Sequence, residues 1–214
     1  MLAILITFSI STIYSVDIEE DNIRTAYATN DGQLSIQPNL YNQRFNANLI
    51  GYGINDSEIA SAEHKWYVGV DAYVIAEQNE SRVMKNPFSY LMENRPNSEL
   101  NLNVLPGIHP IVASSIILGS NLPNYIPKTD KVVITVPTTS SPVYRDILKN
   151  QVIPLANLKK VSLIDRSTAL ISAYLIEHFN RSSKQSSDVL IVDVETQETE
   201  FSYWRLSVQN TQLN

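Results

Sequence analysis

The 214-residue chain contains no cysteine, only six glycines and only three histidines. Without cysteine it has no disulfide, no thiolate ligand for zinc and no cysteine nucleophile. The histidines, His64, His109 and His178, lie far apart and lack the spacing of metal ligands. We therefore interpret them as surface or packing residues.

Positive charge is also scarce. Sixteen Lys and Arg residues face 22 Asp and Glu residues, which gives a net charge of -6, and no basic stripe is visible. This balance argues against a nucleic-acid partner. At 43% hydrophobic and 18% charged residues the chain is expected to fold around a core, as one large domain or a domain with two lobes.

The amino-terminal segment carries an apolar run from Leu2 to Ile13, which is too short to span a bilayer. It resembles the core of a secretory signal peptide, with Ser9, Ser11 and Ser15 near a cleavage point, so residues 1–15 are expected to be such a signal. No Lys or Arg precedes the run, and the alternative is a buried first strand. No other segment is long and apolar enough to predict a membrane span.

The first half of the chain begins with the pattern of a β-meander. Strands are expected at 14–18, 23–29 and 33–39, and Asn30–Gly32 is typical of a hairpin turn. Residues 38–110 are less regular. There a strand end is expected near 48–53, and helices are expected over 68–79 and over 81–94, the last with a late start because of Pro87.

The second half alternates between helices and strands. Helices are expected at 111–118, 141–158 and 167–179, and the middle one begins with Ser140 or Ser141 as its cap and Pro142 in its first turn. The strands between and after them are expected at 131–137, 159–165 and 188–194. This order predicts parallel strands joined by crossovers, and with the meander it predicts an α/β fold whose mixed sheet is flanked by helices.

Two strands end in an aspartate that is followed by an acidic turn. Asp17 stands in "YSVDIEEDN" and Asp193 in "LIVDVETQETE". A carboxylate at a strand end before a tight turn often faces a metal-bound phosphate. The alternatives are solvated strand ends, or a Ca²⁺ site of clustered oxygens; the second is disfavoured because neither turn has the spacing or the central glycine of an EF-hand loop.

The ordered succession of motifs over 131–204 resembles a known family. It reads strand, Val-Pro, helix, Ala-x-Leu, strand, x-Thr-Ala and a helix with Ala-Tyr. This is similar to the first lobe of the ATPase domain of the 70-kDa heat-shock chaperone family, and the similarity covers most of 14–206. Ser15, Val16 and Asp17, directly after the leader, resemble the large endoplasmic-reticulum members, the 170-kDa glucose-regulated (hypoxia up-regulated) chaperones.

The resemblance implies an actin-like ATPase (ribonuclease H-like) fold, of which this chain holds the first lobe only. Residues 16–206 would form that lobe, with 38–109 as its less regular subdomain and 207–214 as a tail. A second lobe would follow in the family, so the chain is expected to come from a truncated gene or to be a retained remnant. The implied cofactors are ATP and Mg²⁺. The implied partners are other chaperones or unfolded client proteins in the endoplasmic-reticulum lumen.

The resemblance also implies roles for individual residues. Asp17 and Asp193 match the family's aspartates at the magnesium, and Asp193 and Glu200 match its catalytic acids. The implied cofactor-binding residues are Asp17, Glu19, Glu20, Thr168, Thr196 and Glu198. For Thr168 the alternative is a packing or capping role at the start of a helix.

The chain departs from the family where the phosphates would bind. The family's two turns are rich in glycine, whereas these carry Glu19 to Asp21 and Glu195 to Glu198, and Arg166 stands where the family has an acid. The family's catalytic lysine has no convincing match. Without glycine the backbone N–H groups cannot form an anion-binding nest, and carboxylates repel phosphate.

Three functions follow as alternatives. The first is a divergent chaperone-family lobe, linked to protein folding, with nucleotide binding and hydrolysis weakened or lost. The second is a pseudo-ATPase that acts as a binding module on a chaperone partner. The third is a sugar-kinase-like member of the same superfold, which the helix "STALISAY" (167–174) disfavours.

Overall fold

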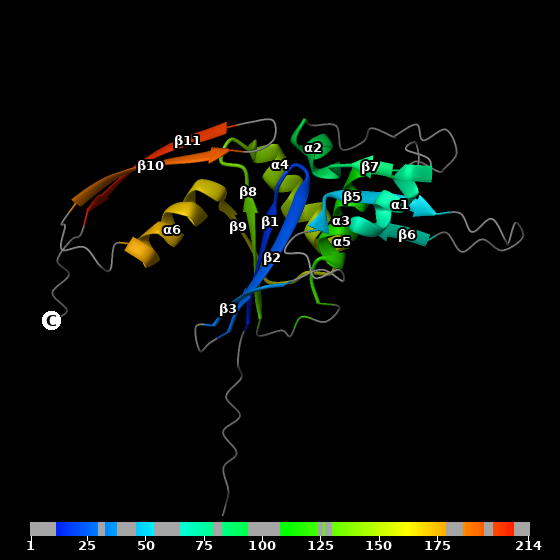
Figure 1. The fold of residues 1–214 in the computed structure, drawn as a ribbon, viewed down its shortest axis with the longest axis horizontal. Helices are drawn as coiled ribbons and strands as arrows, with labels where there is room; N and C mark the ends of the chain where they lie inside the picture. The colour runs from blue at the N-terminus through cyan, green and yellow to red at the C-terminus, as the bar shows by residue number, and fades with distance from the viewer. Residues whose placement is uncertain are drawn as a thin grey trace, which may run out of the picture.

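The computed structural model describes ten segments of the chain: residues 12–29, 33–37, 46–53, 65–78, 83–93, 108–123, 126, 130–178, 186–194 and 199–207. They form a mixed six-stranded sheet, a three-stranded sheet, a two-stranded hairpin and the helices around them (Figure 1). The predicted α/β architecture, a mixed sheet flanked by helices, is thereby confirmed. No helix in these segments is long and apolar enough to cross a membrane.

The main sheet has the order β3–β2–β1–β8–β9, and β4 also pairs with β2. Its first three strands are antiparallel neighbours, and β8 and β9 continue the sheet parallel to β1. The predicted meander and the first two parallel strands are therefore confirmed, while the turn at Asn30–Gly32 lies outside the described residues. The strands are β1 (Ile13–Ile18), β2 (Asn22–Ala28), β3 (Leu34–Ile36), β4 (Asn46–Ala47), β8 (Lys131–Val136) and β9 (Val161–Asp165).

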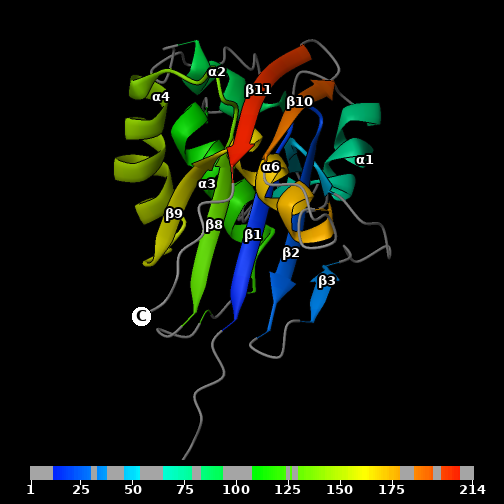
Figure 2. The ribbon, with the colours of Figure 1, turned by 90° about the vertical axis from the view of Figure 1, so that its left-hand side faces the viewer.

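The core of the protein lies on one face of this sheet. Val16, Ile134 and Val136 are fully buried in the two central strands, β1 and β8. Helices on this face pack against them, and α6 lies over the opposite face (Figure 2). The helices are α3 (Pro110–Ser120), α4 (Pro142–Ile147), α5 (Ile153–Leu155) and α6 (Arg166–His178).

The helix predicted over 141–158 runs without a break from Pro142 to Leu155, ends three residues earlier than predicted and is not uniform. Ser141 caps α4, because its hydroxyl accepts a hydrogen bond from the N–H of Tyr144 at 3.1 Å, and Pro142 stands in the first turn as predicted. A π-helical turn over Leu148–Val152 joins α4 to α5. Pro154, the second residue of α5, has no N–H to donate and removes one regular helical hydrogen bond.

The less regular region forms a small sheet of its own. Its order is β6–β5–β7, built from β5 (Leu49–Gly53), β6 (Lys65–Val68) and β7 (Val83–Lys85). The predicted helix over 68–79 appears as α1 (Val70–Gln78), and the second appears as α2 (Pro87–Met92).

Val83 and Met84 were expected on the second of these helices but lie in strand β7. The chain cannot continue as a helix there, because Asn86 adopts a left-handed conformation (φ 43°) before Pro87. The Asn86 side chain caps α2 by accepting from the N–H of Ser89.

The strand predicted at 188–194 was expected to extend the parallel sheet, and this was wrong. Among the described residues β10 (Ser186–Val194) pairs only with β11 (Thr199–Ser207), as an antiparallel hairpin. The hairpin lies on the same side of the main sheet as α6 (Figures 1 and 2). One edge of β10 is therefore occupied by β11 instead of a strand of the main sheet. Residues 1–11 of the predicted leader lie outside the described residues, and Ile13 to Ser15 belong to β1.

Candidate functional site around Arg166

The candidate site lies where three parallel strands end. β1, β8 and β9 run parallel, so their carboxyl ends meet at one edge of the sheet. Helix α6 begins at this edge, directly after β9, and its first residue is Arg166. Arg166 is only 4% exposed, which is unusual for a charged side chain without partners.

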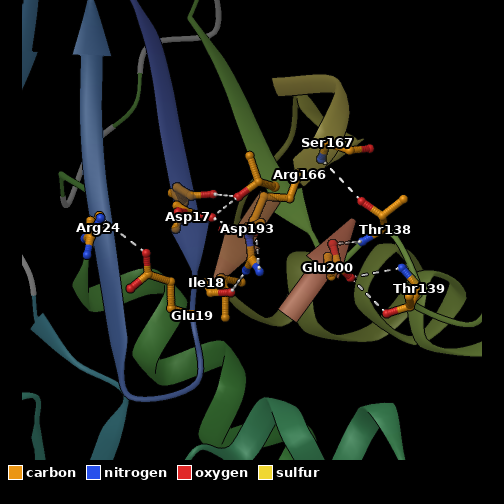
Figure 3. A network of polar contacts seen from close by, with 12 residues as sticks. Asp17, Ile18, Glu19, Arg24, Thr138, Thr139, Arg166, Ser167, Asp193 and Glu200 are labelled. Atoms are coloured by element: carbon orange, nitrogen blue, oxygen red, sulfur yellow. Dashed lines mark hydrogen bonds and ion pairs between the residues drawn. The ribbon is translucent and has the colours of Figure 1, made fainter. Parts of the chain in front are cut away.

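The guanidinium of Arg166 contacts both aspartates that were predicted to hold a metal. Its Nε lies 3.4 Å from Oδ1 of Asp17, and its Nη1 lies 3.6 Å from Oδ2 of Asp193 (Figure 3). Its Nη2 donates a hydrogen bond of 2.7 Å to the backbone carbonyl of Ile18. The fold therefore brings Asp17 and Asp193 to one place, but around an arginine.

Asp17 and Asp193 differ in their further contacts. Asp17 also accepts a hydrogen bond from the Thr135 hydroxyl on β8. Oδ2 of Asp193 is buried and accepts no hydrogen bond from the described residues. The pKa of Asp193 is raised, and burial is the largest cause. The charge of Arg166 lowers this pKa, but the negative charges of Glu200 and Asp17 raise it. Arg166 therefore offsets only part of the cost of holding this carboxylate here.

Glu200 joins the β10–β11 hairpin to the loop after β8. It is paired with Asp193 in the hairpin register, and it accepts hydrogen bonds from the N–H groups of Thr138 and Thr139, each at 3.3 Å, and from the Thr139 hydroxyl at 3.0 Å (Figure 3). Burial alone would raise the pKa of Glu200, but the hydrogen bonds from Thr139 and Thr138 outweigh it, and the pKa is lowered. This geometry gives Glu200 a structural role in docking the hairpin.

The variant Glu200→Gln tests that role, because the free energy of unfolding that it loses should depend on pH. A carboxyl with a lowered pKa stabilises the fold above its unfolded pKa, and this stabilisation is lost as the pH falls through the folded value. The variant should lose about 0.5–1 kcal/mol of unfolding free energy at pH 7, and almost nothing near pH 3. Urea denaturation at both pH values measures this. Glu77→Gln, on the exposed side of α1, is the matched control; equal effects of the two variants would contradict the role.

The other predicted site residues fall into three places. Glu19 follows β1 and forms an ion pair with Arg24 at 3.3 Å, and burial, as the largest cause, raises the pKa of Glu19. Glu20 lies beside it and lines a cavity. Thr168 lies in the first turn of α6, where its carbonyl accepts from the Ser172 hydroxyl.

The start of α6 is held by a residue from another element. The N–H of Ser167 donates to the hydroxyl of Thr138, in the loop after β8, at 3.3 Å. This is the capping contact seen there, in place of one from Thr168. Thr196 and Glu198 lie outside the described residues.

A second ion pair fixes the same edge of the sheet. Arg145 on α4 pairs with Asp165 at the end of β9, and it donates to the backbone carbonyl of Pro137 at 3.3 Å. The loop after β8 is thus held both by Arg145 and by Glu200. The site is a frame of charged side chains and backbone groups joined by ion pairs and hydrogen bonds.

The described residues do not fit Mg²⁺ and ATP. A guanidinium contacts the two carboxylates that the resemblance assigns to the metal, and the turn after β1, which it assigns to a phosphate, carries the carboxylates of Glu19 and Glu20. Within the described segments, no group of three or more His, Asp or Glu side chains is placed to hold a metal ion. The site as built is an internal ion-pair network.

A scan against models of protein families finds no match to this chain, and a search of curated proteins finds none either.

Proposed function

We propose that this chain is a divergent first lobe of the actin-like ATPase class, related to the 70-kDa heat-shock chaperones of the endoplasmic-reticulum lumen. In it nucleotide binding and hydrolysis are weakened or lost. The meander β1–β3, continued by the parallel strands β8 and β9, supports the lobe assignment. So does the convergence of Asp17 and Asp193, which the resemblance pairs at one metal. The protein would then act by binding, on a chaperone partner or an unfolded client.

The observation that carries the loss of nucleotide binding is the position of Arg166. Its buried guanidinium supplies the positive charge that Asp17 and Asp193 would otherwise take from a metal ion. A divalent cation could enter only by displacing this side chain, which also donates to the carbonyl of Ile18. Displacement would leave a charged group without its partners, which costs several kcal/mol when the group is buried.

Calorimetric titration of the full chain with Mg-ATP tests this proposal. We expect no saturable heat up to millimolar nucleotide, with circular dichroism as the control that the protein is folded. Binding at micromolar concentration would contradict the loss of nucleotide binding. In that case Asp17→Asn should abolish the signal if the nucleotide occupies this site, and should leave it unchanged if it binds elsewhere.

A further inference from the structure

The apolar leader carries a pattern that is typical of a signal-peptide cleavage site. Two small residues, Ser9 and Ser11, stand two positions apart in its apolar run. Signal peptidases cut directly after such a pair of small residues. Ser15 does not complete the pattern, because the large residue Ile13 stands two positions before it. The sequence therefore favours cleavage of the peptide bond between Ser11 and Thr12.

The pairing of β1 limits where the leader can end. The first three of the six residues of β1, Ile13–Ser15, pair with β2 on one side and with β8 on the other. β1 lies in the middle of the main sheet (Figure 2). Cleavage after Ser15 would therefore remove half of a central strand, whereas cleavage before Thr12 removes none of the described residues.

The backbone of Thr12, the first described residue, is fixed to the sheet by two hydrogen bonds. Its carbonyl accepts from the N–H of Lys131 at 3.0 Å, and its own N–H donates to Oδ1 of Asp130, also at 3.0 Å. Asp130 is only 4% exposed, and a carboxylate so deeply buried is stabilised by hydrogen bonds and by positive charge. The nitrogen atom that cleavage would release thus lies beside a buried carboxylate, an observation that is independent of the serine pattern.

We propose that a signal peptidase hydrolyses the peptide bond between Ser11 and Thr12, and that the new α-ammonium group of Thr12 pairs with the carboxylate of Asp130. Water cleaves the C–N bond, so that the acyl group of Ser11 leaves as a carboxylate and the nitrogen of Thr12 becomes an ammonium group. A neutral N–H donor is thereby replaced by a charged one, and charge-assisted hydrogen bonds are roughly twice as strong as neutral ones. The expected signal of residues 1–15 is shortened to 1–11.

The cleavage site is tested by translating the full chain in a cell-free system with endoplasmic-reticulum microsomes and sequencing the amino terminus of the processed product. We expect Thr12 as the first residue. Ser11→Leu should abolish this product, because the residue before the cut must be small, whereas Ile10→Leu, the matched control, should leave it unchanged. A different first residue, or the same product from Ser11→Leu, would overturn the cleavage site.

A retained leader would overturn the cleavage site and also the secretory location that the proposed function assumes. The inference depends on that location but not on the relationship to the ATPase class. The titration with Mg-ATP is independent of either result, so failure of the cleavage site and failure of the nucleotide proposal are distinguishable.

Acetylation of the amino terminus tests the ion pair with Asp130. The processed chain, residues 12–214, keeps every described segment. Near pH 6.5 its α-amino group reacts ahead of the lysines, because its pKa of about 8 is lower than theirs of about 10.4. The acetyl group removes the charge but keeps an N–H donor, and it takes the place of the carbonyl of residue 11 in the uncleaved chain. We expect the melting temperature to fall by about 2–4 °C.

Two variants separate the ion pair from other effects of acetylation. In Asp130→Asn, which circular dichroism shows to be folded or not, acetylation should leave the melting temperature unchanged within about 1 °C. In Lys131→Gln, which changes the exposed neighbouring charge, acetylation should lower the melting temperature as in the original chain. An original chain that acetylation does not destabilise would overturn the ion pair even if Asp130→Asn does not fold. So would an equal fall in the original chain and in folded Asp130→Asn.

Discussion

Arg166→Met is expected to lower the free energy of unfolding by about 3 kcal/mol, the lower end of the range for removing one partner of a buried ion pair. The lower end applies because the side chains of Asp17 and Asp193 keep 31% and 23% exposure, so water screens part of their repulsion. Methionine keeps a long apolar side chain at a buried position but removes both ion pairs and the hydrogen bond to the Ile18 carbonyl. Urea denaturation at pH 7 measures the loss.

The same variant also tests what Arg166 replaces. Without the guanidinium, Asp17 and Asp193 become two nearby carboxylates with no cation between them, which favours binding of a divalent ion. Millimolar Mg²⁺ or Ca²⁺ should therefore raise the melting temperature of Arg166→Met and leave that of the original chain unchanged.

A triple variant provides the control. Asp17→Asn and Asp193→Asn, added to Arg166→Met, remove the repulsion and should restore most of the lost stability and abolish the response to metal. A loss of stability that is the same in the single and triple variants would show that Arg166 acts through packing alone. The charge-replacement interpretation would then be wrong.

Much of this edge of the sheet was predictable from local sequence. The apolar strands that end at Asp17 and Asp165, and the capping and proline signals at Ser141 and Pro142, all depend on neighbouring residues, and the structure confirms these elements. The carboxyl ends of parallel strands lie at one edge of a sheet. The predicted parallel strands therefore also indicated that Asp17, at the end of β1, lies close to the residues that follow β8 and β9. Arg166 was recognised as a departure from the family pattern. Its contacts were not predictable, because its partners lie 149 and 27 residues away along the chain.

The hairpin β10–β11 shows where a local pattern fails. The unbroken apolar run from Val189 to Val192 is typical of a strand buried on both faces. In the structure Leu190 is 62% exposed and Val192 is 48% exposed, and across the hairpin Phe201 is 70% exposed. The run cannot indicate which surface covers each face, since this depends on tertiary packing. The hydroxyls of Thr138 and Thr139 were missed for a related reason. A loop residue shows its role only through a distant partner, which is Ser167 for Thr138 and Glu200 for Thr139.

Asn48→Asp is expected to destabilise the protein by at least about 3 kcal/mol at pH 7, because it places a carboxylate against three oxygen atoms. Asn48 is 3% exposed, and its Nδ2 donates to the backbone carbonyls of Glu19 (3.0 Å) and Glu20 (3.3 Å) and to Oδ1 of Asn86 (3.1 Å). It thereby joins the turn after β1 to the cap of α2, two segments that line the same cavity.

The sign of the pH dependence identifies the cause. Burial among acceptors would raise the folded pKa of the new aspartate, so its destabilisation should be smallest below the ordinary Asp pKa of about 4 and should grow as the pH rises through the folded value. Urea denaturation at about pH 3, below the ordinary Asp pKa, and at pH 7 measures this difference. Gln151→Glu, the same amide-to-acid change at an exposed position of the π-helical turn, should change stability by no more than about 0.5 kcal/mol at either pH. If Asn48→Asp behaves like this control, the three hydrogen bonds of Asn48 do not hold the turn after β1 in place.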